Sequence, residues 1–338
     1  MNSEDIKTLK RHLKTRCRIV LVPHKNPDGD AIGACLGLFH LLRQQGHEVI
    51  PVSPNDFPGF LKWMPGSESF EIYDHNTGRA KELLKNADLV FTLDFNSLDR
   101  SGSMATTLQD LDGTFVMIDH HQSPGRYAQI TYSDPGMSST CEMVYHFIQA
   151  LGEGDRIDAN IAACLYTGIL TDTGSFKYAA TTPTTMRVAA ELMERGAPHT
   201  QIHRDIFDTN RPERLQLLGC ALQNLVILKP YRTAYITLTQ EELNRHDFRK
   251  GDTEGFVNYG LSLKDVVLAA IFIENRDEGI IKISLRSQGA FSVNEMARAH
   301  FEGGGHINAA GGRSTESIGD TVKRFESILP QYEKQLAG

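Results

Sequence analysis

Acidic and histidine side chains follow three short apolar runs of this sequence and one helical pattern. The groups are His24, Asp28 and Asp30 after the run 17–23, Asp94 at the end of 87–94, Asp119, His120 and His121 at the end of 114–119, and Asp172 after the helical pattern 158–170. Carboxylates gathered in one place cannot all stay ionised without cations, because each raises the pKa of its neighbour. Oxygen and imidazole ligands without a thiolate suit Mn²⁺ or Mg²⁺. The pattern predicts a pair of divalent metals that activates water for phosphoryl transfer.

Each of these residues has a simpler explanation when it is taken alone. An aspartate at a strand end often caps a helix or closes a turn, and for Asp94 alone we would prefer that interpretation. His120 or His121 alone fits a hydrogen-bonded core histidine. The loop from Asp28 to Asp30 alone fits the start of a helix. Separate explanations do not account for so many groups at one edge, so we favour the joint interpretation.

The elements that must position these residues alternate between strands and helices over the first two thirds of the chain. Apolar runs that predict strands cover 17–23, 47–52, 87–94 and 114–119, and helical periodicity covers 31–45, 140–151, 158–170 and 184–195. This order, with nearly continuous apolar strands, predicts an α/β fold with a doubly wound, mostly parallel sheet. Such sheets bind ligands beyond the carboxyl ends of their strands, which is where the acidic groups fall.

The pattern changes after Gly196. A polar connector with helical features spans 199–218, and two predicted hairpins follow, 221–228 with 231–238 and 265–274 with 279–286. A glycine-rich stretch, 303–312, precedes a last helix over 318–335. We therefore expect a catalytic, metal-binding domain over 1–195, a linker over 196–219 and a smaller α+β domain over 220–338.

Composition and charge restrict the classes of function. The 338 residues include 35 Lys and Arg against 42 Asp and Glu, a formal charge of −7, and no run of basic residues makes the face that binders of long nucleic acid present. We expect no long duplex as a partner. The longest strongly apolar run, 266–273, is too short to span a bilayer, and residues 1–10 are polar. Five cysteines without a CxxC pair indicate free, mostly buried thiols. We therefore expect a cytoplasmic protein that does not associate with membranes.

Taken in order, the motifs resemble those of the DHH phosphoesterase family, which is named after the triplet that stands here as Asp119-His120-His121. The other N-terminal motifs are the segment 24–30, the strand that ends in Asp94, and Thr-Asp-Thr-Gly at 171–174. The C-terminal part resembles the DHHA1 domain through Gly-Gly-Gly-His at 303–306 and Ser-Leu-Arg-Ser at 284–287. The resemblance covers nearly the whole chain, and five motifs in the same order make it specific at the level of the family.

The resemblance implies a role for each residue. One metal takes His24, Asp28 and Asp94, and the other takes Asp30, Asp94, His120 and Asp172, with Asp94 as the bridge. Asp119 is implied to orient His120. His121 is implied to orient the substrate phosphate or to protonate the leaving oxygen. In the DHHA1 domain, the implied contacts to phosphate or nucleotide are Arg286, His306, Gly303, Gly304 and Gly305, because glycines let backbone amides approach an anion closely.

Four further residues are weaker candidates for substrate contact. Ser175 and Lys177 follow Asp172, although Lys177 fits a solvated surface lysine equally well. Asn258 either positions the substrate or has a polar, helix-facing role. Asn308 either caps the next helix or contacts phosphate.

The acidic two-domain chain best resembles the nanoRNase group. These metal-dependent phosphodiesterases degrade very short single-stranded oligoribonucleotides to mononucleotides, and many also remove the 3′-phosphate of 3′-phosphoadenosine 5′-phosphate (pAp), which releases AMP. We expect this activity here with two divalent ions, Mn²⁺ rather than Mg²⁺. Hydrolases of cyclic di-AMP and its linear product pApA share the layout and are the alternative. A catalytically silent nucleotide-binding relative is a second alternative, although it should have lost a metal ligand and every matched position here is filled. The resemblance also implies a homodimer.

Overall fold

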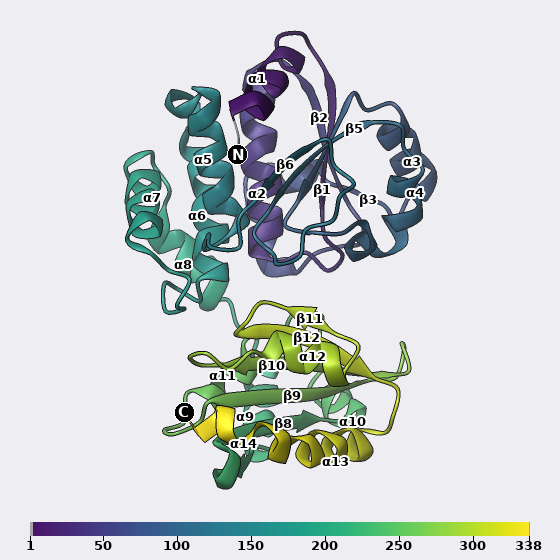
Figure 1. Cartoon of the computed structure of the whole chain (residues 1–338), viewed down its shortest axis with the longest axis vertical. Coiled ribbons are helices and arrows are strands. Elements are labelled where there is room, and N and C mark those ends of the chain that lie inside the picture. Colours follow the sequence, from purple (N-terminus) through teal and green to yellow (C-terminus); the bar gives the residue numbers. More distant parts are fainter. Residues whose placement is uncertain (1–2, 338) are drawn as a thin grey trace. The chain divides into compact units, whose positions relative to one another are not determined.

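The computed structural model describes residues 3–337 of the chain, which forms two compact units (Figure 1). The units are Met1–Thr209 and Asn210–Gly338. Their boundary falls inside the segment predicted as a connector. Helices α8 (His199–Phe207) and α9 (Pro212–Gln223) occupy that segment, one in each unit, so the connector is helical over most of its length, as its pattern indicated.

The first unit is built on a six-stranded parallel sheet in the order β3-β2-β1-β4-β5-β6. Its strands are β1 (Arg18–Pro23), β2 (Glu48–Ser53), β3 (Glu71–Ile72), β4 (Leu89–Leu93), β5 (Thr114–Asp119) and β6 (Ile130–Ser133). The chain order reverses between β1 and β4, and doubly wound sheets bind their ligands beyond the carboxyl ends of the strands at such a point. The predicted α/β class and parallel sheet are confirmed.

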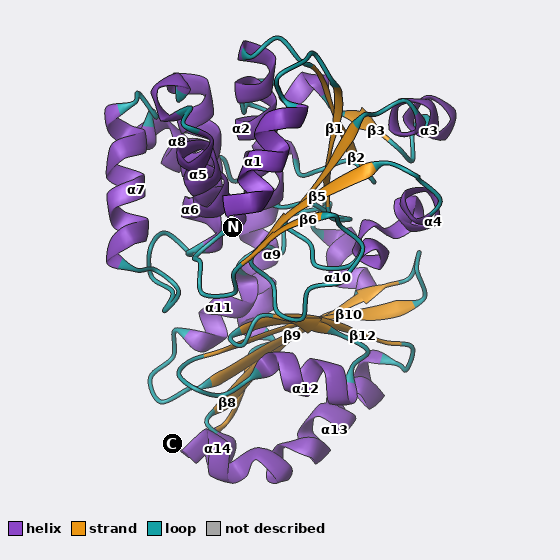
Figure 2. Cartoon of the chain, turned by 45° about the horizontal axis from the view of Figure 1, so that its top comes forward, coloured by secondary structure: helices purple, strands orange, loops and turns teal. Residues whose placement is uncertain are grey.

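Helices lie on both faces of this sheet (Figure 2). The first-unit helices other than α8 are α1 (Ser3–His12), α2 (Gly29–Gln44), α3 (Thr77–Lys85), α4 (Ala105–Gln109), α5 (Thr140–Leu151), α6 (Ala159–Asp172) and α7 (Pro183–Glu194). Side chains of β1 alternate between the two faces. Ile19 and Leu21 belong to the core cluster that includes residues of α2, α5 and α6, while Val20 and Val22 pack in the cluster with residues of α3 and α4. The strand is therefore buried on both sides, which explains its unbroken apolar sequence.

Helices α2 and α6 approach each other closely because glycines line their contact. A Cβ added to Gly33 of α2 would lie 2.5 Å from the carbonyl oxygen of Cys164 in α6. A Cβ added to Gly168 of α6 would lie 2.1 Å from Sγ of Cys141 and 2.9 Å from Oδ1 of Asp30. This close packing brings Asp172, at the end of α6, near Asp30, in the first turn of α2.

The second unit has a six-stranded mixed sheet in the order β11-β12-β10-β9-β8-β7, in which only the pair β8–β9 is parallel. Its strands are β7 (Val226–Leu228), β8 (Thr233–Leu238), β9 (Leu268–Asn275), β10 (Ile280–Ser287), β11 (Gly304–Gly305) and β12 (Ala309–Ser314). Its helices, besides α9, are α10 (Gln240–Arg245), α11 (Phe256–Leu261), α12 (Val293–His300), α13 (Ile318–Ile328) and α14 (Glu333–Ala337). Residues of α12, α13 and α14 share one core cluster with the sheet, and residues of α9, α10 and α11 share another. The predicted α+β architecture of this part is confirmed.

The hairpins β7–β8 and β9–β10 are both present and antiparallel, as predicted. One expectation about their extent is wrong. The run 221–228 does not form a single strand, because α9 continues to Gln223 and β7 begins only at Val226. Its apolar residues serve two purposes: Ala221 is buried on the inner face of α9, while Val226 and Ile227 are exposed on an edge strand.

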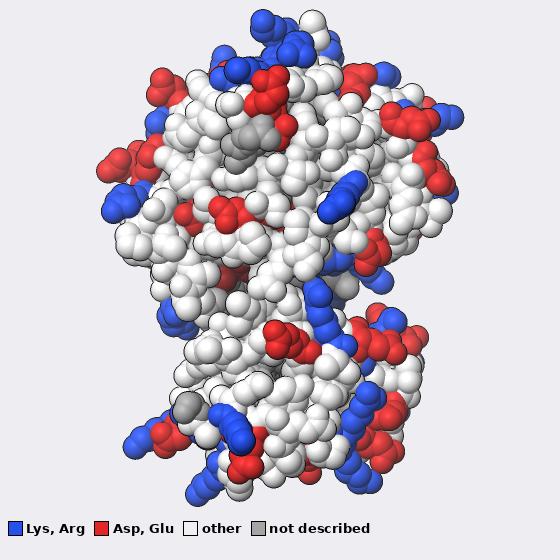
Figure 3. Space-filling model, viewed as in Figure 1, with Lys and Arg blue, Asp and Glu red and all other residues white. Residues whose placement is uncertain are grey.

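The surface carries both signs of charge (Figure 3). Basic side chains gather in the segment from α1 to the start of β1, where Lys7, Lys10, Arg11, Lys14 and Arg16 are exposed. This segment leads into the amino end of β1, whereas the acidic groups follow the carboxyl ends of the strands. All five cysteines are free thiols and four are buried, as expected. Across residues 3–337, none of the helices combines the length and the apolar character that crossing a bilayer requires.

Candidate metal centre

The side chains predicted as metal ligands lie at the carboxyl edge of the first sheet. His24 follows β1 directly, Asp94 follows β4, and Asp119 is the last residue of β5. Asp94 has a φ of 67°, in the left-handed region that residues with a Cβ seldom adopt. Such a backbone costs about 1–3 kcal/mol and persists only where the surroundings hold it, which is common at functional sites.

His24 and Asp28 lie on one side of Asp94. Nε2 of His24 is 3.4 Å from Oδ2 of Asp94 and 3.9 Å from Oδ1 of Asp28. Its Nδ1 lies 2.8 Å from the carbonyl oxygen of Lys25, which can only accept, so Nδ1 carries a proton and donates. Asp28 also caps α2, because Oδ1 accepts from the amides of Asp30 and Ala31. The helix-cap explanation therefore holds for Asp28, and the same carboxylate still faces His24.

His120 lies on the other side of Asp94 and faces three carboxylates. Its Nε2 is 3.4 Å from Oδ2 of Asp172, 3.6 Å from Oδ1 of Asp94 and 3.8 Å from Oδ2 of Asp30. Nδ1 of His120 donates to the carbonyl oxygen of Met137 at 3.2 Å. Burial lowers the pKa of His120, but the negative charges of Asp172, Asp94 and Asp30 outweigh it and raise the pKa to about 9. The ring nitrogen opposite the backbone contact is therefore held among anions.

The carboxylates themselves are perturbed in opposite directions. Burial raises the pKa of Asp30 well above its usual range, and the charges of Asp94 and Asp172 raise it further. Burial also acts to raise the pKa of Asp94, but the hydrogen bond from His24 and the charges of His121, His24 and His120 outweigh it and hold that pKa below its usual range. The cluster thus contains buried negative charge that calls for a cation or a proton.

The donor set fits divalent cations. Within each of three groups of the first unit, one ligand atom from each residue lies within 4.8 Å of the others: His24 with Asp28 and Asp94, Asp30 with His120 and Asp172, and Asp94 with Asp119 and His121. The first group has the same residues as one implied ligand set, and the second group has three of the four residues of the other set, without Asp94. Asp94 offers Oδ2 toward His24 and Oδ1 toward His120, which is the arrangement a bridging carboxylate needs.

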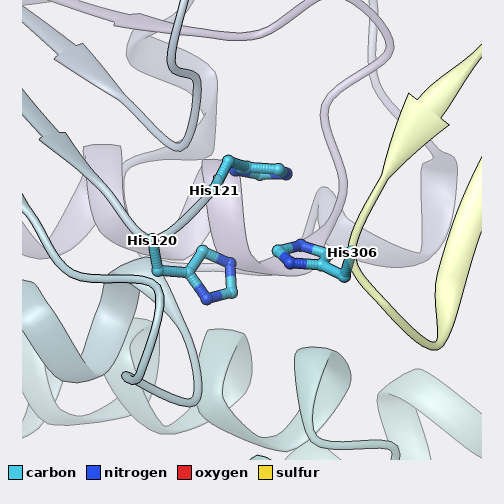
Figure 4. Close-up of side chains that lie close together, drawn as sticks. All are labelled: His120, His121 and His306. Carbon is cyan, nitrogen blue, oxygen red and sulfur yellow. The ribbon is translucent and has the colours of Figure 1, made fainter. Parts of the chain in front are cut away.

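The expectation that Asp119 orients His120 is wrong. Oδ1 of Asp119 accepts a hydrogen bond from Nδ1 of His121 at 2.7 Å, whereas His120 is oriented by the carbonyl oxygen of Met137. Figure 4 shows the rings of His120 and His121 side by side after β5, and it also draws His306 of the second unit. Burial lowers the pKa of His121, and the hydrogen bond to Asp119 opposes that effect. Nδ1 of His121, and not Nδ1 of His120, is therefore hydrogen-bonded to a carboxylate.

Two features of this site were not predicted from the sequence. The first turn of α5 contacts the cluster: the amides of Thr140 and Cys141 donate to the carboxylate of Asp30. The only signal in the sequence was Ser139, whose type suits a helix cap and whose side chain accepts from the amide of Glu142. The second feature is the positive charge of Arg100, which acts to lower the pKa of both His24 and His121.

Asp172 ends α6 and leads into a left-handed turn that contains Ser175. Ser175 and Phe176 have φ angles of 62° and 64°, after Gly174 at 55°. The hydroxyl of Thr173 accepts from the amide of Phe176 and stabilises the turn. Phe176 packs against the first core, which accounts for its apolar side chain, while Lys177 is exposed.

The candidates in the second unit lie on its sheet, in the adjoining loops and in one helix. Arg286 is on β10, where one guanidinium nitrogen donates to the carbonyl oxygen of Leu285 at 3.0 Å. Its Nε is buried, and no hydrogen-bond partner for it occurs among the described residues. His306 forms the turn between β11 and β12, and its amide donates to the carbonyl oxygen of Ala309 at 2.7 Å. Asn258 lies in α11.

Packing and backbone conformation within the second unit explain why glycines precede His306. A Cβ on Gly303 would lie 2.0 Å from the carbonyl oxygen of Gly311, and Gly305 has a φ of 150°. The amide of Gly303 donates to the carbonyl oxygen of Ala297, and that of Gly305 donates to Oδ1 of Asn294 at 3.0 Å. These two amides are therefore engaged inside the unit, contrary to our expectation that they approach an anion.

Asn308 does not cap a helix, because strand β12 follows it. Its side-chain amide donates to Oγ of Ser287 and to the carbonyl oxygen of Gly289. The capping alternative for Asn308 is thus wrong, and the side chain ties the loop before β12 to the end of β10.

Comparison with known proteins gives the family. Residues 18–169 match the DHH family, N-terminal domain, and residues 231–336 match the DHHA1 domain. The chain is 31% identical, over 94% of its length and 90% of the relative's, to the bifunctional oligoribonuclease and PAP phosphatase NrnA of Thermus thermophilus. The chain belongs to the DHH family.

Two further similar proteins extend the comparison. An exopolyphosphatase-related protein from Bacteroides fragilis, known from its crystal structure, superposes with a TM-score of 0.95 at 40% identity, covering 100% of this chain and 98% of that one. The cyclic-di-AMP phosphodiesterase GdpP of Bacillus subtilis is 25% identical over 96% of this chain, which spans 49% of its length. The resemblance read from the motifs is thus confirmed over both parts of the chain.

Proposed function

We propose that this protein is a metal-dependent phosphoesterase that hydrolyses very short oligoribonucleotides to mononucleotides and removes the 3′-phosphate of pAp. The observation that carries the reaction type is the position of His120, whose Nε2 faces three carboxylates at 3.4–3.8 Å. The substrate class follows the whole-chain similarity to a relative named as an oligoribonuclease and PAP phosphatase. In this proposal the first unit carries the chemistry and the second holds the substrate.

The proposed metal ligands fall into two sets that share Asp94. His24, Asp28 and Asp94 hold one divalent ion, and Asp30, Asp94, His120 and Asp172 hold the other, with Mn²⁺ as the favoured ion. When bound, such a pair supplies a hydroxide nucleophile near neutral pH and neutralises charge on the phosphoryl oxygens. The protein holds the ligands in place beforehand: Lys25 and Met137 fix the two ligand imidazoles through their carbonyl oxygens.

His121 and Asp119 are proposed to handle the leaving group. Nδ1 of His121 donates to Asp119, and we propose that Nε2 is the ring nitrogen that acts on the substrate. Nε2 takes up a proton from solvent, the buried carboxylate stabilises the protonated ring, and the ring gives that proton to the leaving oxygen as the phosphorus–oxygen bond breaks. Arg286, His306 and Gly304 are the proposed contacts of the second unit to phosphate or nucleotide, and the buried Nε of Arg286 is an N–H donor suited to an anion. Ser175, Lys177, Asn258 and Asn308 stay as proposed contacts of lower rank.

The proposed function is tested by turnover of the full chain with Mn²⁺ on pAp, RNAs of two to about five nucleotides, pApA, cyclic di-AMP and pyrophosphate. We expect mononucleotides from the shortest RNAs and AMP from pAp. Preference for cyclic di-AMP or pApA would instead support the activity for which GdpP is named. Absence of turnover on every compound would contradict the proposal and favour a nucleotide-binding role.

Two variants separate the proposed roles. Asp94→Asn removes the shared ligand and should abolish both metal binding and turnover. Asp119→Asn keeps the size of the side chain but loses the charge behind His121, so we expect kcat to fall about 10–100-fold while Mn²⁺ affinity stays close to that of the wild type. A normal kcat in Asp119→Asn would show that His121 needs no carboxylate partner.

A further inference from the structure

We propose that Thr140, the first residue of α5, is a positioning residue that holds two of the metal-binding carboxylates in their binding geometry before any metal arrives. The inference rests on the proposed function, because it concerns the same site. The start of α5 is not part of the motifs that carry the family resemblance, and the names of the relatives assign it no role. Thr140 contacts Asp30 and Asp94, which belong to different elements and lie 110 and 46 residues before it in the sequence.

Asp30 is held by the backbone of α5. The amide of Thr140 donates to Oδ2 of Asp30 at 2.6 Å, and the amide of Cys141 donates to Oδ1 at 2.8 Å. These are two of the first amides of a helix, which have no carbonyl partner within their own helix. Helix N-termini favour negative charge, so this contact stabilises the ionised carboxylate. Both oxygens are fixed, and Asp30 cannot rotate without losing a hydrogen bond.

Asp94 is held by the side chain of the same residue. The hydroxyl of Thr140 donates to Oδ1 of Asp94 at 2.8 Å. Asp94 also has the left-handed backbone described above, which persists only where the surroundings hold it. The hydroxyl bond fixes Oδ1 toward His120 and leaves Oδ2 toward His24.

Burial makes these contacts matter more than they would at the surface. Thr140 has no exposed surface, and Asp30 and Asp94 are 1% and 2% exposed. Two neighbouring buried carboxylates repel each other, and without donors they would turn apart or take up protons. The start of α5 offsets that repulsion in the metal-free protein, so less reorganisation accompanies metal binding. The hydroxyl of Thr140 should therefore contribute to metal affinity although it is not a ligand.

The test replaces the hydroxyl with a methyl group. Thr140→Val keeps the shape and the backbone amide and loses only the bond to Asp94, whereas Thr140→Ser keeps the hydroxyl. Thr185→Val is the matched control, because Thr185 is equally buried and its hydroxyl donates to a buried carboxylate outside the cluster, that of Glu142, at 2.9 Å. Mn²⁺ binding to the full chain is measured by calorimetry, with thermal unfolding of the metal-free proteins beside it.

We expect Thr140→Val to bind Mn²⁺ about 10–100-fold more weakly, Thr140→Ser to bind nearly as the wild type does, and Thr185→Val to keep wild-type affinity even if its melting temperature falls. Raising the Mn²⁺ concentration should restore the turnover of Thr140→Val without a change in substrate KM. If Thr140→Val does not fold, Thr140→Ala removes the same hydroxyl without placing a second methyl group against the carboxylates.

Two results would overturn the inference. One is wild-type Mn²⁺ affinity in Thr140→Val together with a lower melting temperature, which is the signature of a purely structural role. The other is an equal loss of affinity in Thr140→Val and Thr185→Val, which would reflect general loosening of the helices. Failure of the proposed function looks different, because the wild-type protein itself would then neither bind Mn²⁺ nor hydrolyse the substrate panel.

Discussion

Metal binding to this protein should release protons, and His120 is one source. The carboxylates around His120 raise its pKa to about 9, so at about pH 7 the ring is mostly protonated in the metal-free protein. A ligand imidazole must be neutral, so binding a metal displaces that proton. A pKa raised this far above the ordinary value corresponds to about 3 kcal/mol of interaction that the metal must replace. The apparent affinity for Mn²⁺ should therefore rise about tenfold per pH unit between about pH 7 and 8, and level off above about pH 9.

The raised pKa of His120 also determines the sign of the pH effect on the free energy of folding. The folded pKa of His120 lies above its unfolded value, so the charged ring stabilises the metal-free fold fully below about pH 6.5. That contribution is lost as the pH rises toward about 9. Saturating Mn²⁺ should remove this part of the pH dependence, because the metal then takes the place of the proton.

Proton release can be counted with a pH-indicator dye at saturating Mn²⁺, or by calorimetry in two buffers of different ionisation enthalpy. We expect at least about one proton per chain at about pH 7, and about one fewer in His120→Asn. His47→Asn is the matched control, because burial lowers the pKa of His47, and the amide of Cys17 donates to its Nδ1. Release of less than about half a proton by the wild-type protein, or equal release by wild type and His120→Asn, would refute the reasoning.

Three other substitutions test the packing that places the ligands and the loop of the second unit. Gly168→Ala puts a methyl group 2.1 Å from Sγ of Cys141 and 2.9 Å from Asp30, so it should cost about 1–3 kcal/mol of unfolding free energy and weaken Mn²⁺ binding, as chemical denaturation and calorimetry would measure. Gly219→Ala lies in open space on α9 and should instead stabilise the protein by about 0.5–1 kcal/mol, so a similar loss in both variants would contradict the packing argument. Asn294→Ala removes the acceptor for the amide of Gly305 and should raise substrate KM while Mn²⁺ affinity stays unchanged; a normal KM would show that the loop does not depend on this contact.

Much of the first unit could be predicted because a buried parallel strand leaves a strong local pattern. The runs that lead to His24, Asp94 and Asp119 are apolar at nearly every position, and strands β1, β4 and β5 appear where those runs lie. Strands of two to four residues, such as β3, β6 and β7, carry too few side chains to show a period. The split of the run 221–228 between α9 and β7 was missed for the same reason.

The partners of individual side chains were harder to predict than the elements that carry them. His120 and His121 are neighbours in sequence, and only the turn after β5 decides that His121, not His120, points its Nδ1 at Asp119. We expected the amides of Gly303 and Gly305 to bind an anion. In the folded unit they donate instead to the carbonyl oxygen of Ala297 and to Oδ1 of Asn294, both in α12.

The sequence by itself determined the alternation of strands and helices, the order of the acidic motifs and the edge of the sheet at which they meet, because the carboxyl ends of parallel strands share one edge. Only the tertiary structure decided how the carboxylates are held there. The contact between Asp30 and the first turn of α5 spans 110 residues, and the approach of α2 to α6 depends on glycines that allow two backbones to come close. Such contacts leave no local period in the sequence, because they depend on packing between segments that meet only in the folded chain.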